Sequence, residues 1–152
     1  LFGEISTGKS SLIKALVPAA DVGVDVRGGS TTETTHYRWR DDGGHEILLT
    51  DVPGTGGHEE GLSELAISEA QRAHVVLFVC DGDLTREEAA AVSELSALGK
   101  PVVVVMNKAD RYSAEQRRLL IDALAAHSAG LIDPSDVVLT TAQPAVQTII
   151  KV

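Results

Sequence analysis

Two glycines, a lysine and a serine near the start of the chain have the spacing of a phosphate-binding loop. The segment Gly3-Glu-Ile-Ser-Thr-Gly-Lys-Ser10 matches the pattern G-x-x-x-x-G-K-S/T. Such a loop turns its backbone N–H groups inward around phosphate oxygens, its lysine reaches the β- and γ-phosphates, and its serine hydroxyl ligates Mg²⁺. Residues 10–16 are predicted to continue as a helix, whose N-terminal dipole also favours phosphate. The sequence therefore predicts a phosphate site that uses Lys9 and Ser10.

A carboxylate and a glycine follow the next apolar run. Asp51-Val-Pro-Gly54 comes directly after a run that ends at Thr50. A carboxylate at a strand end, facing a phosphate loop, can hold the Mg²⁺ shell through water, and the Gly54 N–H can approach the γ-phosphate. We therefore expect Asp51 and Gly54 to face the phosphate loop.

The polar stretch of residues 26–35 is predicted to be a mobile loop, because it is rich in glycine and threonine. A threonine hydroxyl and N–H from this loop would complete the Mg²⁺ shell and sense the γ-phosphate. Thr32 is the preferred candidate, and Thr31, Thr34 and Thr35 remain as alternatives.

A second polar segment has the residue types that recognise a base. Asn107-Lys-Ala-Asp110 follows the apolar run of residues 101–106. The Asp110 carboxylate can accept hydrogen bonds from guanine N1–H and N2–H₂, whereas adenine offers no such pair of donors. The Lys108 stem can pack on the purine face, and Asn107 can tie this segment to the phosphate loop. Thr140-Thr-Ala142 follows the last apolar run, and the Ala142 N–H is predicted to donate to guanine O6.

Apolar runs alternate with helical patterns along the chain, which predicts an α/β doubly wound fold. Strands are expected at residues 46–51, 75–80, 101–106 and 136–140, mostly in a parallel sheet because the runs are continuous. Helices are expected at residues 63–73, 85–98 and 113–127, the last two opened by capping boxes and the last burying a stripe of Leu119, Leu120, Ala123 and Leu124. Residues 35–40 and 45–51, joined by the turn Asp41–Gly44, predict an antiparallel hairpin.

Composition narrows the class of protein. The net charge of −9 argues against direct nucleic-acid binding or a polybasic membrane surface by this domain alone. The single cysteine, Cys80, excludes an intramolecular disulfide and is expected to be a buried core residue rather than a nucleophile. A length of 152 residues suits one domain.

The order of these segments resembles the small GTPase domain of the P-loop GTPases, in its Era-like, ribosome-binding branch. The similarity is carried by GKSSLIKAL, DVPG and GKPVVVVMNKAD and extends from Leu1 to about Ala142. It implies a three-layer α/β/α fold whose six-stranded, mostly parallel sheet has the strand order 2-3-1-4-5-6 and one antiparallel edge strand. Since only Leu1 and Phe2 precede the phosphate loop, we expect residues 1–152 to be a single GTP-binding domain clipped at both ends, a fragment of a longer chain.

The resemblance implies GTP or GDP and Mg²⁺ as ligands. The expected nucleotide-binding residues are Gly3, Ser6, Thr7, Gly8, Lys9, Ser10, Ser11, Asp51, Gly54, Asn107, Lys108, Asp110, Thr141 and Ala142. The expected catalytic residues are Lys9, Thr32 and Gly54, and the expected Mg²⁺ ligands are Ser10, Thr32 and Asp51.

Departures from the family pattern predict slow intrinsic hydrolysis. Thr55 stands where Ras-like proteins carry a water-orienting glutamine, and Ser6 stands where potassium-activated Era-like members carry Asn or Asp. Arg27 is an internal candidate for an arginine finger, and His58 is a candidate for orienting water. A partner or self-association would then accelerate turnover. The alternatives are a guanine-nucleotide-sensing scaffold without hydrolysis and an ATP-using P-loop enzyme.

The expected role is a molecular switch. The γ-phosphate would order residues 28–35 and 54–61, and hydrolysis would release them. An unknown protein or ribosomal partner is expected to bind these regions. The expected localisation is cytoplasmic, with any membrane association supplied by flanking regions.

Overall fold

The computed structural model describes residues 1–4, 6–17, 24–27, 34–53 and 61–142, with residues 24–27 described as backbone only. The helices are α1 (Lys9–Leu16), α2 (Glu64–Arg72), α3 (Arg86–Ala97) and α4 (Ala114–His127), with short 3₁₀ turns η2 (Ala109–Arg111) and η3 (Pro134–Asp136). The strands are β1 (Val24–Arg27), β2 (Thr34–Arg40), β3 (Glu46–Asp51), β4 (Val76–Cys80), β5 (Val102–Met106) and β6 (Val137–Leu139).

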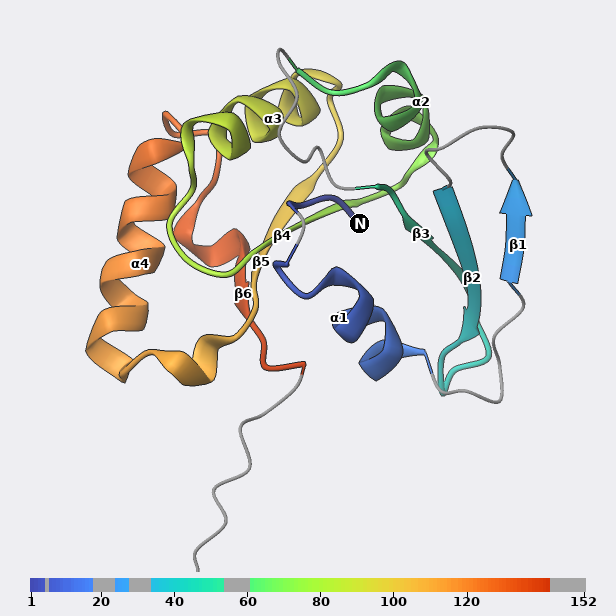
Figure 1. Cartoon of the computed structure of the whole chain (residues 1–152), viewed down its shortest axis with the longest axis horizontal. Helices are drawn as coiled ribbons and strands as arrows, with labels where there is room; N and C mark the ends of the chain where they lie inside the picture. Colours follow the sequence, from blue (N-terminus) through green and yellow to red (C-terminus); the bar gives the residue numbers. More distant parts are fainter. Residues whose placement is uncertain (5, 18–23, 28–33, 54–60, 143–152) are drawn as a thin grey trace, which may run out of the picture.

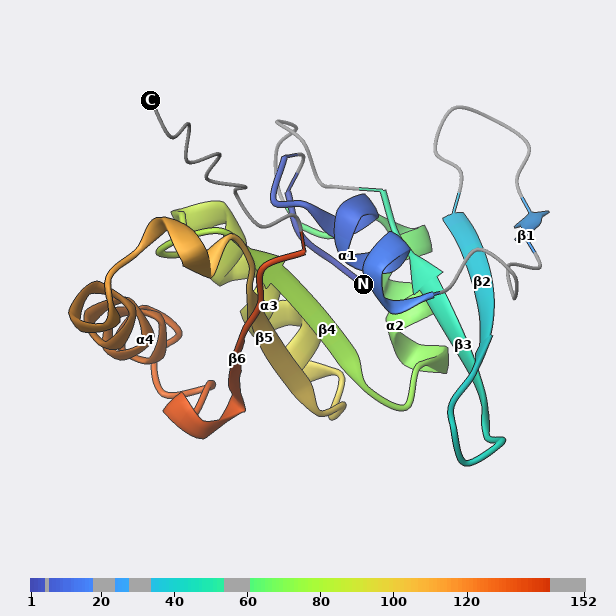
Figure 2. The same cartoon turned by 90° about the horizontal axis from the view of Figure 1, so that it is seen from below.

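The described strands form one antiparallel and one parallel sheet, each of three strands. In the antiparallel sheet β2 lies between β1 and β3, and Tyr37 pairs with Leu49. In the parallel sheet β5 lies between β4 and β6. In Figures 1 and 2 the antiparallel sheet lies at the right of the molecule and the parallel sheet nearer its middle, with the N-terminal residues between them.

Leu1 and Phe2 connect the two sheets by backbone hydrogen bonds. The Leu1 carbonyl accepts from Val52 N–H at 3.1 Å, while Phe2 donates to Leu77 O and accepts from Val79 N–H, both at 2.8 Å. Phe2 thereby makes a parallel bridge to Phe78. These bonds fix where the loop that follows Phe2 leaves the sheet.

Two groups of buried side chains cover opposite faces of the strands. Val79 and Val105 belong to the cluster that contains Leu12 and Ile13 of α1. Their neighbours in the strands, including Phe78 and Val104, belong to the cluster that contains residues of α2, α3 and α4. Because adjacent strand residues point to opposite faces, α1 packs on one face and the other three helices pack on the other. The result is a helix–sheet–helix arrangement in three layers.

The predicted helix starts are confirmed. Thr85 and Glu88 form a capping box at α3, and Ser113 and Gln116 form one at α4. In each, the first side chain accepts from the backbone N–H of the second residue, and that residue's side chain accepts in return. Among the described helices, none combines the length and the apolar character that a bilayer crossing requires.

The fold differs from the sequence-based prediction in the antiparallel part. Instead of a single antiparallel edge strand, three strands pair antiparallel, and β1 was not predicted. The predicted loop of residues 26–35 is wrong at both ends, since Val26 and Arg27 lie in β1 and Thr34 and Thr35 open β2. The β-branched residues Val26, Thr34 and Thr35 favour extended backbone. The edge of β2 supplies the backbone hydrogen-bonding groups with which β1 pairs.

The predicted apolar stripe of α4 is also wrong in part. Leu124 is fully buried, but the Leu119 side chain is 56% exposed. Leu120 packs against the edge of the core. The helix has only one neighbouring layer, so a residue one position away from the buried line turns toward solvent. Cys80, by contrast, is a buried core residue as predicted, and burial raises the pKa of its thiol to about 12.

Candidate nucleotide-binding site

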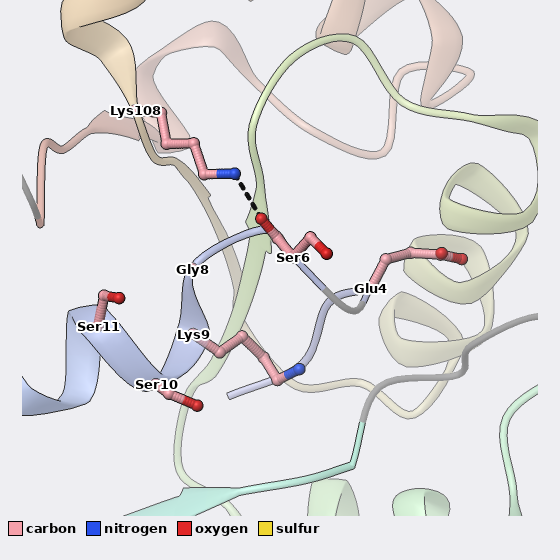
Figure 3. Close-up of a pocket in the computed structure, with 7 residues that line it drawn as sticks. All are labelled: Glu4, Ser6, Gly8, Lys9, Ser10, Ser11 and Lys108. Atoms are coloured by element: carbon pink, nitrogen blue, oxygen red, sulfur yellow. Dashed lines mark hydrogen bonds between the residues drawn. The ribbon is translucent and has the colours of Figure 1, made fainter.

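The phosphate loop leaves the sheet at Gly3 and enters α1 at Lys9. Gly8 and Ser6 have left-handed backbone conformations, with φ of 94° and 77°. The Thr7 hydroxyl donates to the Glu4 carbonyl at 2.9 Å and closes the loop from inside. These turns place the beginning of α1, whose first N–H groups have no partner within the helix, at one side of an open pocket (Figure 3).

Lys9 lies beneath this loop, and its ammonium faces inward. Its Nζ donates to the Gly3 carbonyl at 3.0 Å. Burial lowers the pKa of Lys9, while the nearby Asp51 carboxylate opposes that shift. The ammonium is therefore held in a partly desolvated position, where an added anion would interact with it more strongly than at the surface.

Asp51 ends β3 on the same side of the molecule. Burial raises the pKa of its carboxyl group, and the charge of Lys9 acts in the opposite direction. Its Oδ1 atom is buried and has no hydrogen-bond partner within the described part of the chain. A buried carboxylate oxygen without a partner is costly, and a cation or a bound water would supply one.

Asn107 joins the phosphate loop to the segment after β5. Its buried side chain donates from Nδ2 to the Thr7 carbonyl at 3.0 Å. Its Oδ1 accepts from the Thr140 hydroxyl at 3.2 Å and from the Ala142 N–H at 3.1 Å. One amide thus links its own segment to two others that are far away in sequence, and the predicted tie between Asn107 and the phosphate loop is confirmed.

Lys108 makes the second connection between these segments. Its backbone is left-handed, with φ of 57°, and its Nζ donates to the Ser6 carbonyl (Figure 3). The same Nζ pairs with the Asp81 carboxylate at 2.7 Å. The pocket between the two loops has a volume of about 500 Å³ and is lined by Glu4, Ser6, Gly8, Lys9, Ser10, Ser11 and Lys108.

The predicted residues that line this pocket are Ser6, Gly8, Lys9, Ser10, Ser11 and Lys108. Of the predicted base-recognising residues only Lys108 lines it, and Asp110 lies in η2 with an exposed side chain. The Ala142 N–H, predicted to donate to guanine O6, donates to Asn107 in this structure, and Thr141 lies between the two contacts of Asn107. The predictions for Thr31, Thr32, Gly54, Thr55 and His58 lie outside the described residues, as does the side chain of Arg27.

Two residues of this region were not predicted from the sequence. Asp81 follows β4, and its carboxylate pairs with Lys108. Tyr112 follows η2, and its hydroxyl donates to the Asp81 carbonyl at 2.8 Å. The available signal was the position of Asp81 directly after an apolar run, at the same sheet edge as Asn107.

The family comparison matches this arrangement. The model of the 50S ribosome-binding GTPase family matches residues 1–108, which include the phosphate loop, Asn107 and Lys108. The chain belongs to this GTPase family. It is 33% identical over 121 residues to GTPase Der of Vibrio parahaemolyticus, a match that spans 76% of this chain and 24% of that relative. The domain is thus a GTPase-family domain of the Era type, and it spans about a quarter of the length of the curated relative.

Solved structures of this class share the fold. Aquifex aeolicus Era bound to GDP and AlF₄⁻ superposes with a TM-score of 0.71 and 26% identity, covering 93% of this chain and 49% of that one. The cytosolic domain of the Thermotoga maritima FeoB iron transporter in its GMPPNP form superposes with a TM-score of 0.62 and 25% identity, covering 92% of this chain and 54% of that one. Both neighbours were solved with guanine nucleotides or their analogues.

Gly8→Ala is expected to disrupt the junction between the two loops. A Cβ at Gly8 would lie 2.2 Å from Asn107 Nδ2, in a backbone conformation with φ of 94° that alanine adopts poorly. The Asn107–Thr7 hydrogen bond would have to break. We expect a melting temperature lowered by about 5–10 °C, measured without nucleotide, and a weakened affinity for GDP.

Gly44→Ala is the matched control for this substitution. Gly44 has a φ of 81°, and a Cβ added to it would meet nothing within 4 Å, so the substitution carries the backbone strain without the collision. It should lower the melting temperature by about 2–6 °C and leave GDP affinity unchanged. Equal effects of the two substitutions on GDP binding would contradict the importance of the junction at Gly8.

Proposed function

We propose that the whole protein is a Mg²⁺-dependent GTPase that works as a conformational switch with slow intrinsic turnover, and that residues 1–152 form one nucleotide-binding domain. The observation that carries this proposal is the double connection between the two loops of the pocket. Asn107 and Lys108, from the base-recognising segment, both bind the carbonyl groups of the phosphate loop. A purine base and a polyphosphate chain would therefore be held by one continuous, rigid unit.

Different residues around the pocket would contact different parts of the nucleotide. The N–H groups of Gly8–Ser11 at the start of α1 would receive phosphate oxygens, together with the Lys9 ammonium, which would leave the Gly3 carbonyl. The Lys108 stem would lie against the base, and the Asp110 carboxylate would select guanine. The Ala142 N–H would reach O6 by sharing or exchanging its present contact with Asn107.

The residues present are suited to Mg²⁺, which prefers hard oxygen ligands and retains several waters. The exposed Ser10 hydroxyl lies at the start of α1. The Oδ1 of Asp51, which has no hydrogen-bond partner among the described residues, lies near Lys9. Thr32 would supply the remaining protein ligand. When bound, the ion would neutralise the charge that develops on the phosphate oxygens.

Residues 28–35 and 54–61 would be the switch segments that bind a partner. Era has been solved in complex with a fragment of 16S ribosomal RNA, and the matching family is described as ribosome-binding. A ribosomal partner is therefore the first to test for this protein, and self-association is the second route to faster turnover. Direct contact with RNA is not expected from this domain, because the net charge is −9.

We further infer that the two sheets are halves of one sheet with the family's strand order. In that order, the segment before the phosphate loop stands between β3 and β4. The backbone bonds of Leu1 and Phe2 to Val52, Leu77 and Val79 support this placement. The order would be β2-β3-(Leu1, Phe2)-β4-β5-β6, with β1 added outside β2.

A single-turnover assay tests the proposed activity. The protein is mixed with a substoichiometric amount of γ-labelled GTP and Mg²⁺, and phosphate release is followed with and without K⁺. We expect slow release above the uncatalysed rate that needs Mg²⁺ and does not respond to K⁺, since Ser6 replaces the Asn or Asp of potassium-activated members. Absence of release in both salts would favour a nucleotide-sensing scaffold instead.

Asp51→Asn should weaken the response to Mg²⁺ without weakening the fold. Burial raises the pKa of Asp51, so the folded protein binds this proton more tightly than the unfolded chain. The ionised carboxylate therefore costs stability at neutral pH, and the cost fades as the pH falls through the raised pKa. We expect an unchanged or higher melting temperature without nucleotide at neutral pH, a difference that disappears in acid, and a loss of Mg²⁺ affinity of about 10- to 100-fold in the GTP complex.

Asp42→Asn provides the control, because Asp42 is an exposed aspartate in the turn between β2 and β3. It changes the net charge by the same amount at a distance from the pocket. Its Mg²⁺ titration should match that of the unmodified protein. A strongly lowered melting temperature for Asp51→Asn would show that Asp51 supports the fold rather than a cation.

A further inference from the structure

The Asp81 carboxylate forms an ion pair with Lys108, the lysine that connects the two loops of the pocket. Asp81 directly follows β4, and its Oδ2 lies 2.7 Å from Lys108 Nζ. The same Nζ donates to the Ser6 carbonyl, so one ammonium connects the β4–α3 segment with the phosphate loop. An ammonium has three donors and no acceptor, and a carbonyl alone would leave its direction poorly determined.

The backbone around Asp81 is fixed independently of this ion pair. Asn107 N–H donates to the Cys80 carbonyl at 2.8 Å, and the Tyr112 hydroxyl donates to the Asp81 carbonyl at 2.8 Å. Gly82 packs so closely that a Cβ there would lie 3.2 Å from the Tyr112 hydroxyl. The backbone that carries the Asp81 carboxylate is therefore held in place with or without the lysine.

The position of the pair suits a positioning role better than a contribution to stability. The side chains of Lys108 and Asp81 are 24% and 40% exposed, so the ion pair by itself stabilises the fold little. Lys108, however, lines the nucleotide pocket, and Asp81 does not. Holding the lysine in place before nucleotide arrives removes part of the ordering cost of binding.

We propose that Asp81 is a positioning residue of the nucleotide site, which holds the Lys108 ammonium against the phosphate loop so that the stem of Lys108 is ready to receive the base. This inference rests on the proposed assignment of Lys108 to the nucleotide site. It adds a residue from the β4–α3 segment that acts on nucleotide affinity through Lys108 alone.

A double-mutant cycle on the whole protein tests the proposal. The Kd and dissociation rate of fluorescently labelled GDP are measured for Asp81→Ala, Lys108→Ala and the double variant, with melting temperatures taken without nucleotide. We expect Asp81→Ala to raise the Kd about three- to fivefold, mainly through faster dissociation. In the Lys108→Ala background the same substitution should change the Kd by less than about 1.5-fold, because its target is gone.

Two further variants control for misfolding and for the loss of a nearby negative charge. Asp81→Asn keeps the shape of the side chain, and it should weaken GDP binding in the same direction even if the alanine variant does not fold. Asp83→Ala is the matched control, because Asp83 is an aspartate of the same segment that pairs with His127 at 2.9 Å instead of with the pocket. It should leave the Kd for GDP unchanged.

The outcomes separate the two assignments. Equal loss of affinity from Asp81→Ala in both backgrounds, or the same loss from Asp83→Ala, would overturn the proposal in favour of a general structural role. Unchanged GDP binding in Asp81→Ala, alongside weak binding in Lys108→Ala, would overturn the role of Asp81 alone. Normal GDP binding in Lys108→Ala would overturn the nucleotide-site assignment of Lys108 and this proposal with it.

Discussion

Replacing Asp110 with asparagine is expected to change the base preference of the protein from guanine to xanthine. In the proposed site the carboxylate would accept hydrogen bonds from guanine N1–H and N2–H₂, whereas an asparagine amide would offer a donor where guanine also has one. Xanthine carries a carbonyl oxygen in place of the 2-amino group and would accept from that amide. A site that loses such a matched polar pair discriminates by about 10⁴-fold, so GDP affinity should fall by about that factor.

The surroundings of Asp110 make this substitution a test of recognition rather than of folding. Its carboxylate is exposed, and the η2 turn is held by backbone atoms on either side. Ala109 N–H donates to the Thr140 carbonyl at 3.0 Å, and Arg117 Nε donates to the Ala109 carbonyl at 2.8 Å. An asparagine should therefore occupy the same position without disturbing the loop.

Competition between GDP and XDP for a fluorescent nucleotide is the measurement. Asp122→Asn, an exposed aspartate on α4, removes the same charge away from the pocket and should keep the preference for GDP. If Asp110→Asn bound GDP as tightly as the unmodified protein does, the base would have to be recognised elsewhere. Tight binding of ATP by the unmodified protein would be equally inconsistent with this assignment.

The pocket was predictable from the sequence because its parts lie where neighbouring strands end. The phosphate loop follows Phe2, and the Asn107 segment follows β5, both at the carboxyl edge of the parallel strands. Parallel strands bring such ends together whatever the details of packing. The tie between Asn107 and the phosphate loop was therefore an expected outcome of topology, whereas the Thr7 carbonyl as the accepting group is known only from the structure.

The Asp81–Lys108 pair was not predictable in the same way. An aspartate at the end of a strand is usually a solvated loop residue, and nothing in its spacing to Lys108 distinguishes it. Its partner is chosen by the direction in which Lys108 leaves a left-handed backbone position, which only the folded structure fixes. A similar limit applied to β1, whose four residues become a strand only because β2 offers them an edge.

Lys9→Met is expected to have the largest effect on hydrolysis while sparing the fold. Methionine keeps an unbranched apolar stem of similar length but removes the ammonium. Burial lowers the pKa of Lys9, so the folded protein binds this proton less tightly than the unfolded chain does. The charged form therefore costs stability below the lowered pKa, a range that includes neutral pH, and the variant without nucleotide should melt at the same or a higher temperature.

The destabilisation caused by the partly buried Lys9 ammonium is offset only when an anion binds beside it. The ammonium donates to the Gly3 carbonyl, a neutral acceptor that an anionic phosphate would replace. A preorganised cation that meets the charge developing in phosphoryl transfer contributes about 10²- to 10³-fold to the rate, and single-turnover phosphate release should fall by that factor. Lys14→Met, on the exposed side of α1, is the control and should keep the rate of the unmodified protein.

A melting temperature that drops sharply in Lys9→Met, with hydrolysis reduced only in proportion to the folded fraction, would contradict this account. The lysine would then serve the loop through its bond to Gly3 rather than the nucleotide. The opposite signs expected for stability and activity distinguish the two roles: a structural lysine lowers both when it is removed. Removal of a lysine that is kept partly desolvated to bind a phosphate lowers only the activity.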